Sequence, residues 1–309
     1  MKELTQDILE SIYDELQSAI CEGKVRKNIP LSQLTTFKIG GPAPILVEPA
    51  SVQEAQACAR ICNKHAVEMR VIGCGSNILV ADAGISCVLL KFGEAFANIS
   101  ISGTTITAQA GATNENVANA ALEANLTGYE FASGIPGSIG GAAVMNAGAY
   151  DGEFSQVASC IQCMTTEGEL VEIPAEEADF GYRHSKMMAE NLIVLSAKLE
   201  LSKGNHEEIA ALMADLKQRR ESKQPLEMPS AGSTFKRPEG YFAGKLIQDA
   251  GLKGYRVGGA MVSEKHSGFV VNAGGATAAD VMQLITDVQN KVYEHEGVKL
   301  EPEVRLWGF

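Results

Sequence analysis

A glycine-rich stretch near the middle of the chain constrains the fold more than any other feature. Six glycines lie within residues 128–148, and residues 132–150 follow neither a helical nor a strand period. Ordering so many glycines costs conformational entropy, which close contact between bare backbone and a flat ligand or its phosphates would offset. A glycine-bent corner of a sheet would account for two or three of them. The density over residues 133–142 therefore favours a ligand-binding loop.

A second glycine loop, Gly73–Asn77, follows a predicted strand over residues 69–72. Its glycines let backbone N–H groups approach a phosphate, and its serine and asparagine add further donors. It is not a dinucleotide-binding fingerprint, because position 78 is isoleucine and a strand rather than a helix follows. Taken alone, the loop is equally well explained as a tight turn.

The composition is that of a globular protein with about two domains. Of the 309 residues, 45% are hydrophobic and 21% are charged, and the net charge is −12. Such acidity argues against binding nucleic acid through the whole surface. No apolar stretch approaches the roughly 20 residues that span a bilayer, and the acidic N-terminus lacks the apolar core of an export signal. We therefore expect a cytoplasmic protein without membrane insertion.

The seven cysteines indicate neither a metal site nor a disulfide framework. One C-x-x-C pair, Cys160 and Cys163, lies in a predicted strand, where the spacing places the two thiols on opposite faces. The five histidines show no metal-ligand spacing. We expect reduced core cysteines and no metal.

Hydrophobic periods predict an α+β protein. A helix is expected over the first 22 residues, with Leu4, Ile8, Ile12, Leu16 and Ile20 on one face. A β-α-β unit follows, with strands over residues 45–48 and 69–72 and a helix ending near residue 65. Thr113, and the pair Thr277 and Asp280, are candidate helix caps. The other predicted elements are strands over residues 78–80, 87–91, 99–101, 105–109, 158–165, 170–173 and 192–201, and helices over residues 114–124, 206–223, 242–250 and 278–294.

Positive charge is concentrated in one segment of this acidic chain. Residues 217–265 hold ten lysines and arginines against five acidic residues, a net charge of +5, so the rest of the chain carries −17. Such a segment favours an anionic small ligand, for example a nucleotide diphosphate. A solvated helix face would explain Lys217, Arg219 and Arg220, but less easily the later charges in loops.

Six short segments, in this order along the chain, resemble the motifs of the UDP-N-acetylenolpyruvoylglucosamine reductase family: Val71–Asn77, Gly134–Ser138, Asn146–Tyr150, Tyr182–Arg183, Ala231–Ser233 and Glu301–Arg305. Each is weak alone, but the set is specific. The resemblance implies a two-subdomain FAD-binding (PCMH-type) fold over residues 35–203, with subdomains over about 35–97 and 98–203. A C-terminal α+β substrate-binding domain over residues 204–309 follows, and residues 1–34 form an N-terminal helix and lead-in.

The resemblance also implies a reaction. Members of the family use NADPH and FAD to reduce the enolpyruvyl group of UDP-N-acetylglucosamine enolpyruvate to UDP-N-acetylmuramate, in bacterial peptidoglycan precursor synthesis. Ser233 matches the serine that gives a proton to the substrate. Arg183 and Glu303 match the pair that stabilises the enolate-like intermediate, the arginine as a fixed charge and the glutamic acid as a hydrogen-bond or proton donor. Without the family, these residues are explained as a turn cap, a surface arginine and an ion-pair partner of Arg305.

Binding residues follow from the same resemblance. FAD contacts are implied for Gly73, Cys74, Gly75, Ser76, Asn77, Ser133, Gly134, Pro136, Gly137, Ser138, Gly141, Asn146, Gly148 and Ala149. Substrate contacts are implied for Tyr182, Arg220, Lys223, Lys236, Arg237 and Lys265, with Arg220 and Lys223 holding the diphosphate. Neither glycine loop contains a histidine, so non-covalent FAD is expected, and we expect a monomer.

The chain departs from the family pattern in two places. Many relatives carry a tyrosine-bearing loop that covers the substrate, whereas residues 184–222 here contain no tyrosine. The chain thus resembles the shorter class of the family, and how its substrate site closes is open. Four residues after Ser233 it has Arg237, where some relatives have asparagine.

Two other functions stay open. A flavin oxidase of the same fold class would be reoxidised rapidly in air without NADPH and would not need Ser233. A non-catalytic sensor of nucleotide sugars would bind its ligand without retaining flavin, and the glycine density over residues 133–142 argues against it.

Overall fold

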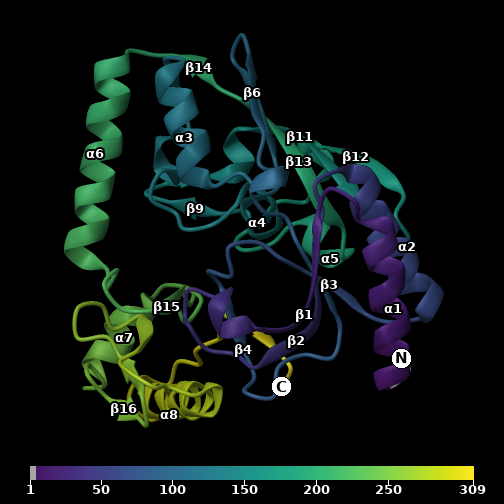
Figure 1. Cartoon of the computed structure of the whole chain (residues 1–309). Helices are drawn as coiled ribbons and strands as arrows, with labels where there is room; N and C mark the ends of the chain where they lie inside the picture. The colour runs from purple at the N-terminus through teal and green to yellow at the C-terminus, as the bar shows by residue number, and fades with distance from the viewer. Residues whose placement is uncertain (1–4) are drawn as a thin grey trace. The chain divides into compact units, whose positions relative to one another are not determined.

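The computed structural model describes residues 5–309, which form two compact units (Figure 1). The first unit consists of the described residues up to Asn28, together with Pro44–Cys74 and Cys87–Arg219. The second consists of Ile29–Ala43, Gly75–Ser86 and Arg220–Phe309. The units therefore interleave along the chain, while the domain boundaries expected after residues 34 and 203 remain predictions.

The first unit contains two sheets. Their strands are β1 (Lys24–Pro30), β2 (Pro42–Glu48), β3 (Met69–Ile72), β5 (Val88–Lys91), β6 (Ile99–Ser102), β7 (Thr105–Gln109), β11 (Ala158–Met164), β12 (Leu170–Pro174) and β13 (Ile193–Glu200). One sheet has the order β1-β2-β5-β3, with β5 parallel to β2 and β3. The other is antiparallel, with the order β12-β11-β13-β7-β6.

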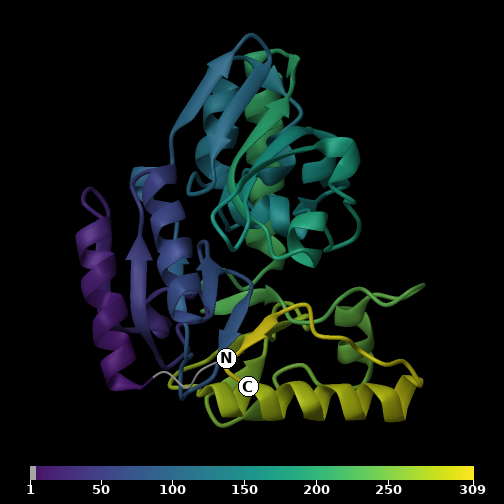
Figure 2. The same ribbon diagram turned by 90° about the vertical axis from the view of Figure 1, so that its right-hand side faces the viewer.

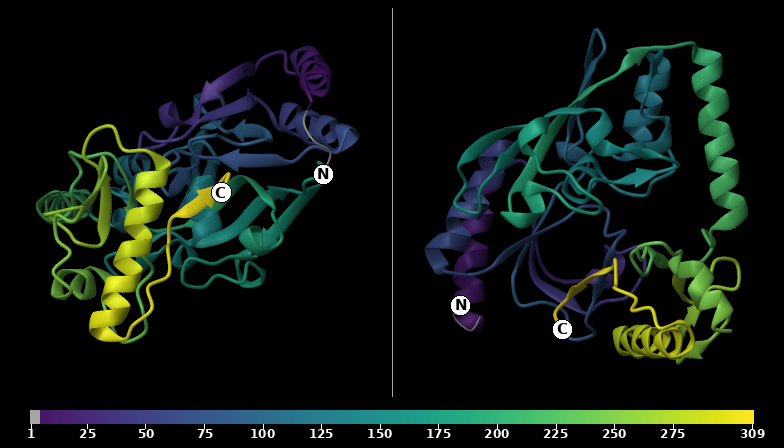
Figure 3. Two further views of the ribbon diagram at one scale, coloured as in Figure 1. Left: turned by 90° about the horizontal axis from the view of Figure 1, so that it is seen from below. Right: turned by 180° about the vertical axis from the view of Figure 1, so that it is seen from behind.

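The described residues of the first unit also form helices. They are α1 (Gln6–Ala19), α2 (Val52–His65), α3 (Asn114–Glu123), α4 (Ile139–Met145), α5 (Lys186–Ala189) and α6 (His206–Lys223), whose last turn belongs to the second unit. Two short strand pairs join β8 (Leu126–Thr127) to β14 (Ser202–Lys203) and β9 (Gly148–Ala149) to β10 (Gly152–Glu153). Helix α6 begins beside the end of α3, where His206 Nδ1 lies 3.1 Å from Leu122 O (Figure 3).

The second unit has its own sheet and core. Strands β15 (Ser230–Ser233), β16 (Arg256–Val257), β17 (Ala260–Val262) and β18 (Phe269–Asn272) pair antiparallel in the order β15-β18-β17-β16. Strands β4 (Ile78–Val80) and β19 (Arg305–Trp307) pair in parallel, α7 spans Ala243–Asp249, and α8 (Ala278–Glu296) packs on β16 and β17 (Figure 2). Phe37 and Leu79, from the first third of the chain, are buried in the same core as Val281 and Leu284 of α8.

Side-chain caps explain where three predicted helices begin. Ser51 Oγ and Thr113 Oγ1 each accept a hydrogen bond from the backbone N–H three residues later, at 3.2 and 3.1 Å. Thr277 and Asp280 form the reciprocal capping box of α8, with both bonds at 3.0 Å. The caps predicted at Thr113 and at Thr277 with Asp280 are confirmed, because these side chains satisfy N–H groups that no helical carbonyl can reach.

The N-terminal helix is shorter than the sequence predicted. Helix α1 ends at Ala19, so Ile20 lies at its C-cap, although Ile20 is buried like Ile12 and Leu16. Leu4, which was expected on the same face, lies outside the described residues.

The prediction that residues 132–150 contain no periodic element is wrong for α4. This helix carries two glycines and has a long cap contact, with Ser138 Oγ 3.5 Å from Gly141 N. A Cβ atom added to Gly140 would lie 3.1 Å from the Cβ of Ala110, so glycine permits the helix to approach the end of β7. Tertiary packing therefore overrides the poor helix propensity of glycine.

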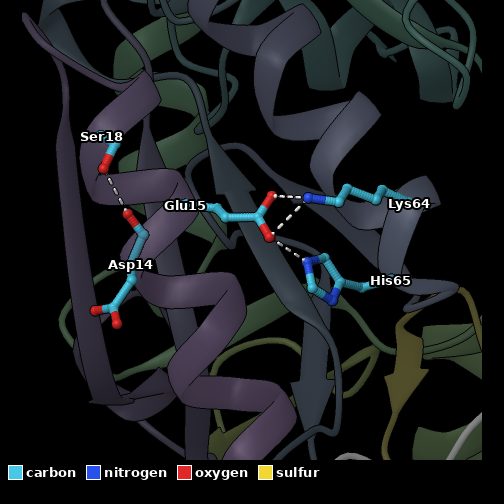
Figure 4. A network of polar contacts seen from close by, with 5 residues as sticks. All are labelled: Asp14, Glu15, Ser18, Lys64 and His65. Carbon is cyan, nitrogen blue, oxygen red and sulfur yellow. Dashed lines mark hydrogen bonds and ion pairs between the residues drawn. The ribbon is translucent and has the colours of Figure 1, made fainter.

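Helices α1 and α2 pack against each other, and polar groups link their exposed edges. The Glu15 carboxylate lies 2.8 Å from Lys64 Nζ and 2.8 Å from His65 Nε2 (Figure 4). Exposed pairs of this kind contribute little, because water screens them. The fully buried side chains of Ile12 and Leu16 instead provide the main stabilisation of the α1 face.

A buried carboxylate ties the loop after α1 to the start of α2. Glu54, which is 7% exposed, accepts hydrogen bonds from the backbone N–H groups of Cys21 (2.8 Å), Glu22 (2.7 Å), Gly23 (3.1 Å) and Ala50 (2.8 Å). Burial by itself would raise the pKa of Glu54, but these donors outweigh it and hold the pKa below its ordinary value. The ionised carboxylate is therefore part of the folded structure.

Replacing this carboxylate should destabilise the fold in a pH-dependent way. We expect Glu54→Gln to lower the free energy of unfolding at pH 7 by about 2–4 kcal/mol, since an amide NH₂ would face N–H donors. The pKa of Glu54 is lower in the folded state than in the unfolded state. The stabilisation by its ionised carboxylate is therefore fully present above the unfolded-state pKa, and it is lost as the pH falls through the folded-state pKa. Urea denaturation at pH 7 and below pH 4 measures this, with the exposed Glu22→Gln as a charge-matched control. Equal stability of the two variants at pH 7 would contradict the expectation.

The cysteines are only partly core residues. All seven are free thiols; Cys58, Cys62, Cys87 and Cys163 are buried, but Cys21 and Cys74 are exposed, which corrects the prediction for those two loop positions. Burial raises the pKa of the Cys163 thiol to about 12, so it stays protonated at neutral pH. Cys160 Sγ instead donates to the exposed Glu172 at 3.1 Å, which confirms that the C-x-x-C thiols lie on opposite faces.

The described residues 5–309 give two further negative findings. None of their helices is both long and apolar enough to cross a bilayer. Among them, His, Cys, Asp and Glu side chains form no cluster of three or more that could hold a metal ion.

Candidate active site

The two glycine loops meet within the first unit. A Cβ atom added to Gly73, at the end of β3, would lie 2.6 Å from Ser138 Oγ, at the start of α4. The second loop is tied to the start of α3, because Gly137 O accepts a hydrogen bond from Asn114 N at 3.0 Å. Glycine at position 73 thus lets two segments far apart in sequence approach more closely than any side chain would allow.

Loop Gly73–Asn77 continues from the first unit into the second, which begins at Gly75. Gly75 has a φ of +62°, and an added Cβ would lie 2.1 Å from Leu34 O. Its carbonyl accepts a hydrogen bond from Thr36 N at 3.2 Å. The fold therefore requires glycine at position 75, whatever it binds.

Other residues predicted to contact FAD differ in exposure. Pro136, Gly141 and Cys74 are exposed, whereas Ser133 is half-buried and its hydroxyl donates to Glu130 O at 2.8 Å. Partial desolvation raises the pKa of the Cys74 thiol above its ordinary value, which favours the protonated form. The half-buried residues Gly134, Gly137 and Ser76 lie in the loops, and Gly148 and Ala149 form β9.

Arg183 and Tyr182 form the tip of a tight turn in the first unit. Gly181 and His184 close it with paired backbone hydrogen bonds of 3.1 and 3.2 Å. Arg183 has a φ of +54°, a left-handed conformation that is uncommon for a residue with a side chain. Its guanidinium carbon lies 5.1 Å from the centroid of the Tyr182 ring, which is 52% exposed. The turn therefore presents a cation beside an exposed aromatic ring.

Ser233 is exposed at the end of a β-bulge in the second unit. Ser230 pairs with Val271 and Ser233 with Phe269, so β15 has one more residue than its partner between these pairs. Gly232, inside the bulge, has a φ of +75°. Such bulges change the direction of the following side chain, and only glycine adopts this backbone without strain. The bulge thus fixes the backbone of Ser233 and the direction in which its side chain leaves the strand.

Glu303 is held beside this bulge by its backbone. Glu303 N donates to Thr234 O at 2.8 Å, and Glu303 O accepts from Asn77 Nδ2 at 3.3 Å. Asn77 O in turn accepts from Arg305 N at 3.0 Å. Within the second unit, the structure therefore places the end of the first glycine loop, the segment after Ser233 and the segment of Glu303 together.

Several predicted substrate-binding cations lie near acidic or aromatic groups of their own unit. Lys236 Nζ lies 3.2 Å from Glu301 Oε2, and Lys265 Nζ donates to Glu221 O at 2.6 Å. The Arg237 guanidinium carbon lies 4.1 Å from the ring centroid of Phe242. Lys223 is exposed in the last turn of α6, and Arg220 is half-buried one turn earlier. The positive segment is thus partly neutralised locally, which net charge along a sequence cannot show.

Two residues that organise these segments were missed by the sequence analysis. Thr36 Oγ1 donates to Ser230 O at 2.7 Å, next to the bulge. Asp82 accepts hydrogen bonds from Ala278 N (2.8 Å) and Ala279 N (3.1 Å) at the start of α8. The contacts of Thr36 and of Asp82 each join residues nearly two hundred positions apart, so no local pattern could predict them. The glycines near Thr36 were the one sequence signal for its role.

A surface depression of about 480 Å³ lies on the first unit, away from the predicted site residues. It is lined by Asp14, Glu15, Ser18, Ala19 and Ile61, three of which are drawn in Figure 4. Nothing in this lining matches the predicted chemistry.

The first unit provides a backbone that fits FAD. Bare backbone at Gly73 faces the hydroxyl of Ser138, and the exposed Gly141 leaves the start of α4 open. Loops of this composition suit the close approach of phosphates and of a flat ring.

Comparison with known proteins agrees with this fit. Residues 43–174, which include both glycine loops, match the family model of an FAD binding domain. Residues 224–307 match the C-terminal domain of UDP-N-acetylenolpyruvoylglucosamine reductase.

Complete relatives cover nearly the whole chain. A UDP-N-acetylenolpyruvoylglucosamine reductase from Clostridium perfringens is 50% identical over 287 residues, which cover 93% of this chain and 94% of the relative. The crystal structure of the enzyme from Thermus caldophilus matches with a TM-score of 0.81 and 35% identity, over 92% of this chain and 99% of that one.

A more distant structure, p-cresol methylhydroxylase, matches with a TM-score of 0.50 and 13% identity, over 97% of this chain and 66% of that chain. This likeness concerns the fold alone. The predicted fold class, an α+β PCMH-type FAD-binding fold followed by a C-terminal domain, is confirmed. The chain belongs to the UDP-N-acetylenolpyruvoylglucosamine reductase family of flavin-dependent oxidoreductases.

Proposed function

We propose that Ser233, Glu303 and Arg183 perform the reaction of this family. That reaction is the NADPH-dependent reduction of the enolpyruvyl group of UDP-N-acetylglucosamine enolpyruvate to UDP-N-acetylmuramate. FAD held by the glycine loops would supply the redox chemistry that side chains lack, namely transfer of hydride from NADPH to the substrate alkene. The observation that carries the assignment of roles is the bulge that places the backbone of the exposed Ser233 next to the Glu303 segment.

Ser233 donates a proton to one carbon of the enolpyruvyl double bond, and the hydride is added to the other carbon. A hydroxyl is a weak acid, so it acts only where its position is fixed and the charge left behind is stabilised. The left-handed Gly232 and the pairing of Ser233 with Phe269 fix the backbone from which this side chain projects. This rigidity supports the role of proton donor.

Arg183 and Glu303 stabilise charge on the substrate. As negative charge builds up on the enolpyruvyl carboxylate, a fixed guanidinium attracts it, and the glutamic acid donates a hydrogen bond or a proton. The strained turn of Arg183 supports this role, because strain in a backbone tends to collect at functional positions.

The remaining predicted contacts are part of the same proposal. The glycine-loop residues, with Asn146, Gly148 and Ala149, hold FAD without a covalent bond. Tyr182, Lys236, Arg237 and Lys265 bind the sugar nucleotide, while Arg220 and Lys223 bind its diphosphate. The neighbours of Lys236, Lys265 and Arg237 in the protein are a carboxylate, a carbonyl and an aromatic ring, respectively.

We also place this activity in the bacterial cytoplasm, in peptidoglycan precursor synthesis, and infer that the protein acts as a monomer. The kinship with the reductase family and the acidic, globular composition support this setting.

The test is NADPH consumption by the purified protein, with a scan of the same cuvette for bound flavin. We expect consumption that depends on UDP-N-acetylglucosamine enolpyruvate and is absent with UDP-N-acetylglucosamine, which lacks the enolpyruvyl group. A yellow protein that ignores the sugar nucleotide and consumes oxygen would instead be an oxidase. A colourless protein that stays inactive after added FAD would overturn the proposal.

A further inference from the structure

The turn that carries Arg183 needs support from outside itself. It has only two residues at its tip, and Arg183 adopts a φ of +54°. Within the turn, the paired hydrogen bonds of Gly181 and His184 are the contacts that close it. A strained conformation of this kind persists only when surrounding structure holds it.

Two buried side chains hold the turn, one on each side. Before the turn, Asn146 Nδ2 donates to Gly181 O at 3.1 Å, and after it, Ser185 Oγ donates to Val144 O at 2.7 Å. Asn146 is 1% exposed and Ser185 is fully buried. Both bonds reach the C-terminal end of α4, because Val144 lies in its last turn and Asn146 is its C-cap.

Asn146 is itself held rigidly. Its Nδ2 also donates a hydrogen bond to Glu153 Oε2 at 3.0 Å, and its Oδ1 accepts one from Ser155 N at 2.9 Å. Its own φ of +41° places it in the left-handed region, where asparagine is tolerated better than most residues. Both amide hydrogens are therefore committed inside the protein.

Helix α4 continues the connection to the glycine loops. It starts at Ser138, whose hydroxyl faces the bare backbone of Gly73. With only seven residues and a close contact to the end of β7, it is a short, firmly packed link. Helix α4 thus supports both the backbone around the predicted flavin site and the turn of Arg183.

We propose that Asn146 and Ser185 are positioning residues that clamp the Arg183 turn to α4 and so set where the guanidinium meets the substrate. The proposal rests on the role of Arg183 given above. Ser185 also caps α5, because its Oγ accepts from Met188 N at 3.3 Å. Losing this serine should therefore have two separable effects, a loss of helix capping and a loss of the hold on the turn.

The test compares two half-reactions by stopped-flow absorbance of the flavin. Ser185→Ala should slow reoxidation of the reduced enzyme by the enolpyruvyl substrate by about tenfold to a hundredfold, because a small displacement of a catalytic group costs this much. Reduction by NADPH should stay within about twofold, since Arg183 acts on the substrate. Ser185→Thr keeps the hydroxyl and should restore the rate.

Ser51→Ala is the matched control for stability. Ser51 caps α2 in the same unit with a comparable bond, to Glu54 N at 3.2 Å, but is not attached to the turn. Both alanine variants should lower the melting temperature through the lost cap, and only Ser185→Ala should slow reoxidation.

Asn146→Gly and Arg183→Ala complete the set. Glycine keeps the left-handed backbone at position 146 and removes the side-chain bonds to Gly181, Glu153 and Ser155. Slow reoxidation with retained FAD, together with slow reoxidation in Ser185→Ala, supports the clamp. Slow reoxidation in Arg183→Ala, with wild-type rates in Ser185→Ala and Asn146→Gly, would overturn the clamp alone. A wild-type rate in Arg183→Ala would overturn the role of Arg183 and the clamp with it.

Discussion

Ser233→Ala is expected to keep reduction of the flavin by NADPH and to slow reduction of the enolpyruvyl substrate by about a thousandfold. A positioned general acid contributes about 10²–10⁴-fold, and alanine at this position removes the only exchangeable proton of this side chain. Hydride transfer from NADPH requires no such proton. Stopped-flow absorbance measures both half-reactions separately in one sample.

A neighbouring serine provides the control for this prediction. Ser230 lies in the same strand, three residues before Ser233, and its contact with Thr36 uses its backbone carbonyl. We expect Ser230→Ala to retain both half-reactions. An equal loss of both half-reactions in Ser233→Ala would show damage to the flavin site and would remove the role of proton donor.

Glu303→Ala is expected to slow the same substrate half-reaction by about a hundredfold or more. Removing one group that stabilises developing charge costs about 10²–10³-fold. The backbone bonds of Glu303 to Thr234 and Asn77 stay in place in this variant, so the segment should keep its position. The measurement is again reoxidation of the reduced enzyme, with retention of FAD read from its absorbance.

Glu303→Gln separates the two roles that are open for this residue. An amide donates a hydrogen bond but cannot give up a proton, so a rate near wild type would identify Glu303 as a hydrogen-bond donor. Glu301→Gln makes the same charge change two residues earlier, where the exposed carboxylate pairs with Lys236. If Glu301→Gln slowed reoxidation as much as Glu303→Ala, a general loss of charge rather than a specific contact would be responsible.

Local features of the fold could be predicted from the sequence. The helix from Ala278, with its capping box at Thr277 and Asp280, depends on contacts between residues three or four positions apart. The glycine density around Gly137 predicted a ligand loop, since few structural roles need so many bare backbones. Ser233, Arg183 and Glu303 had no distinguishing local pattern, and only the set of family motifs singled them out.

Other features depend on contacts between distant segments. Helix α4 contradicts the propensity of its own glycines, and it forms because Gly140 packs closely on Ala110. The core of the second unit takes Phe37 and Leu79 from the first third of the chain.

The sequence by itself determined the family and the secondary-structure elements with strong periods and caps, and it predicted which loops bind the cofactor. Only the tertiary structure decided how the two units divide the chain, how the bulge at Gly232 presents Ser233, and that Asn146 and Ser185 hold the turn of Arg183. The reason is physical: caps and periods involve neighbours along the chain, whereas these contacts join segments about forty to two hundred residues apart, whose pairing depends on the packing of the whole unit.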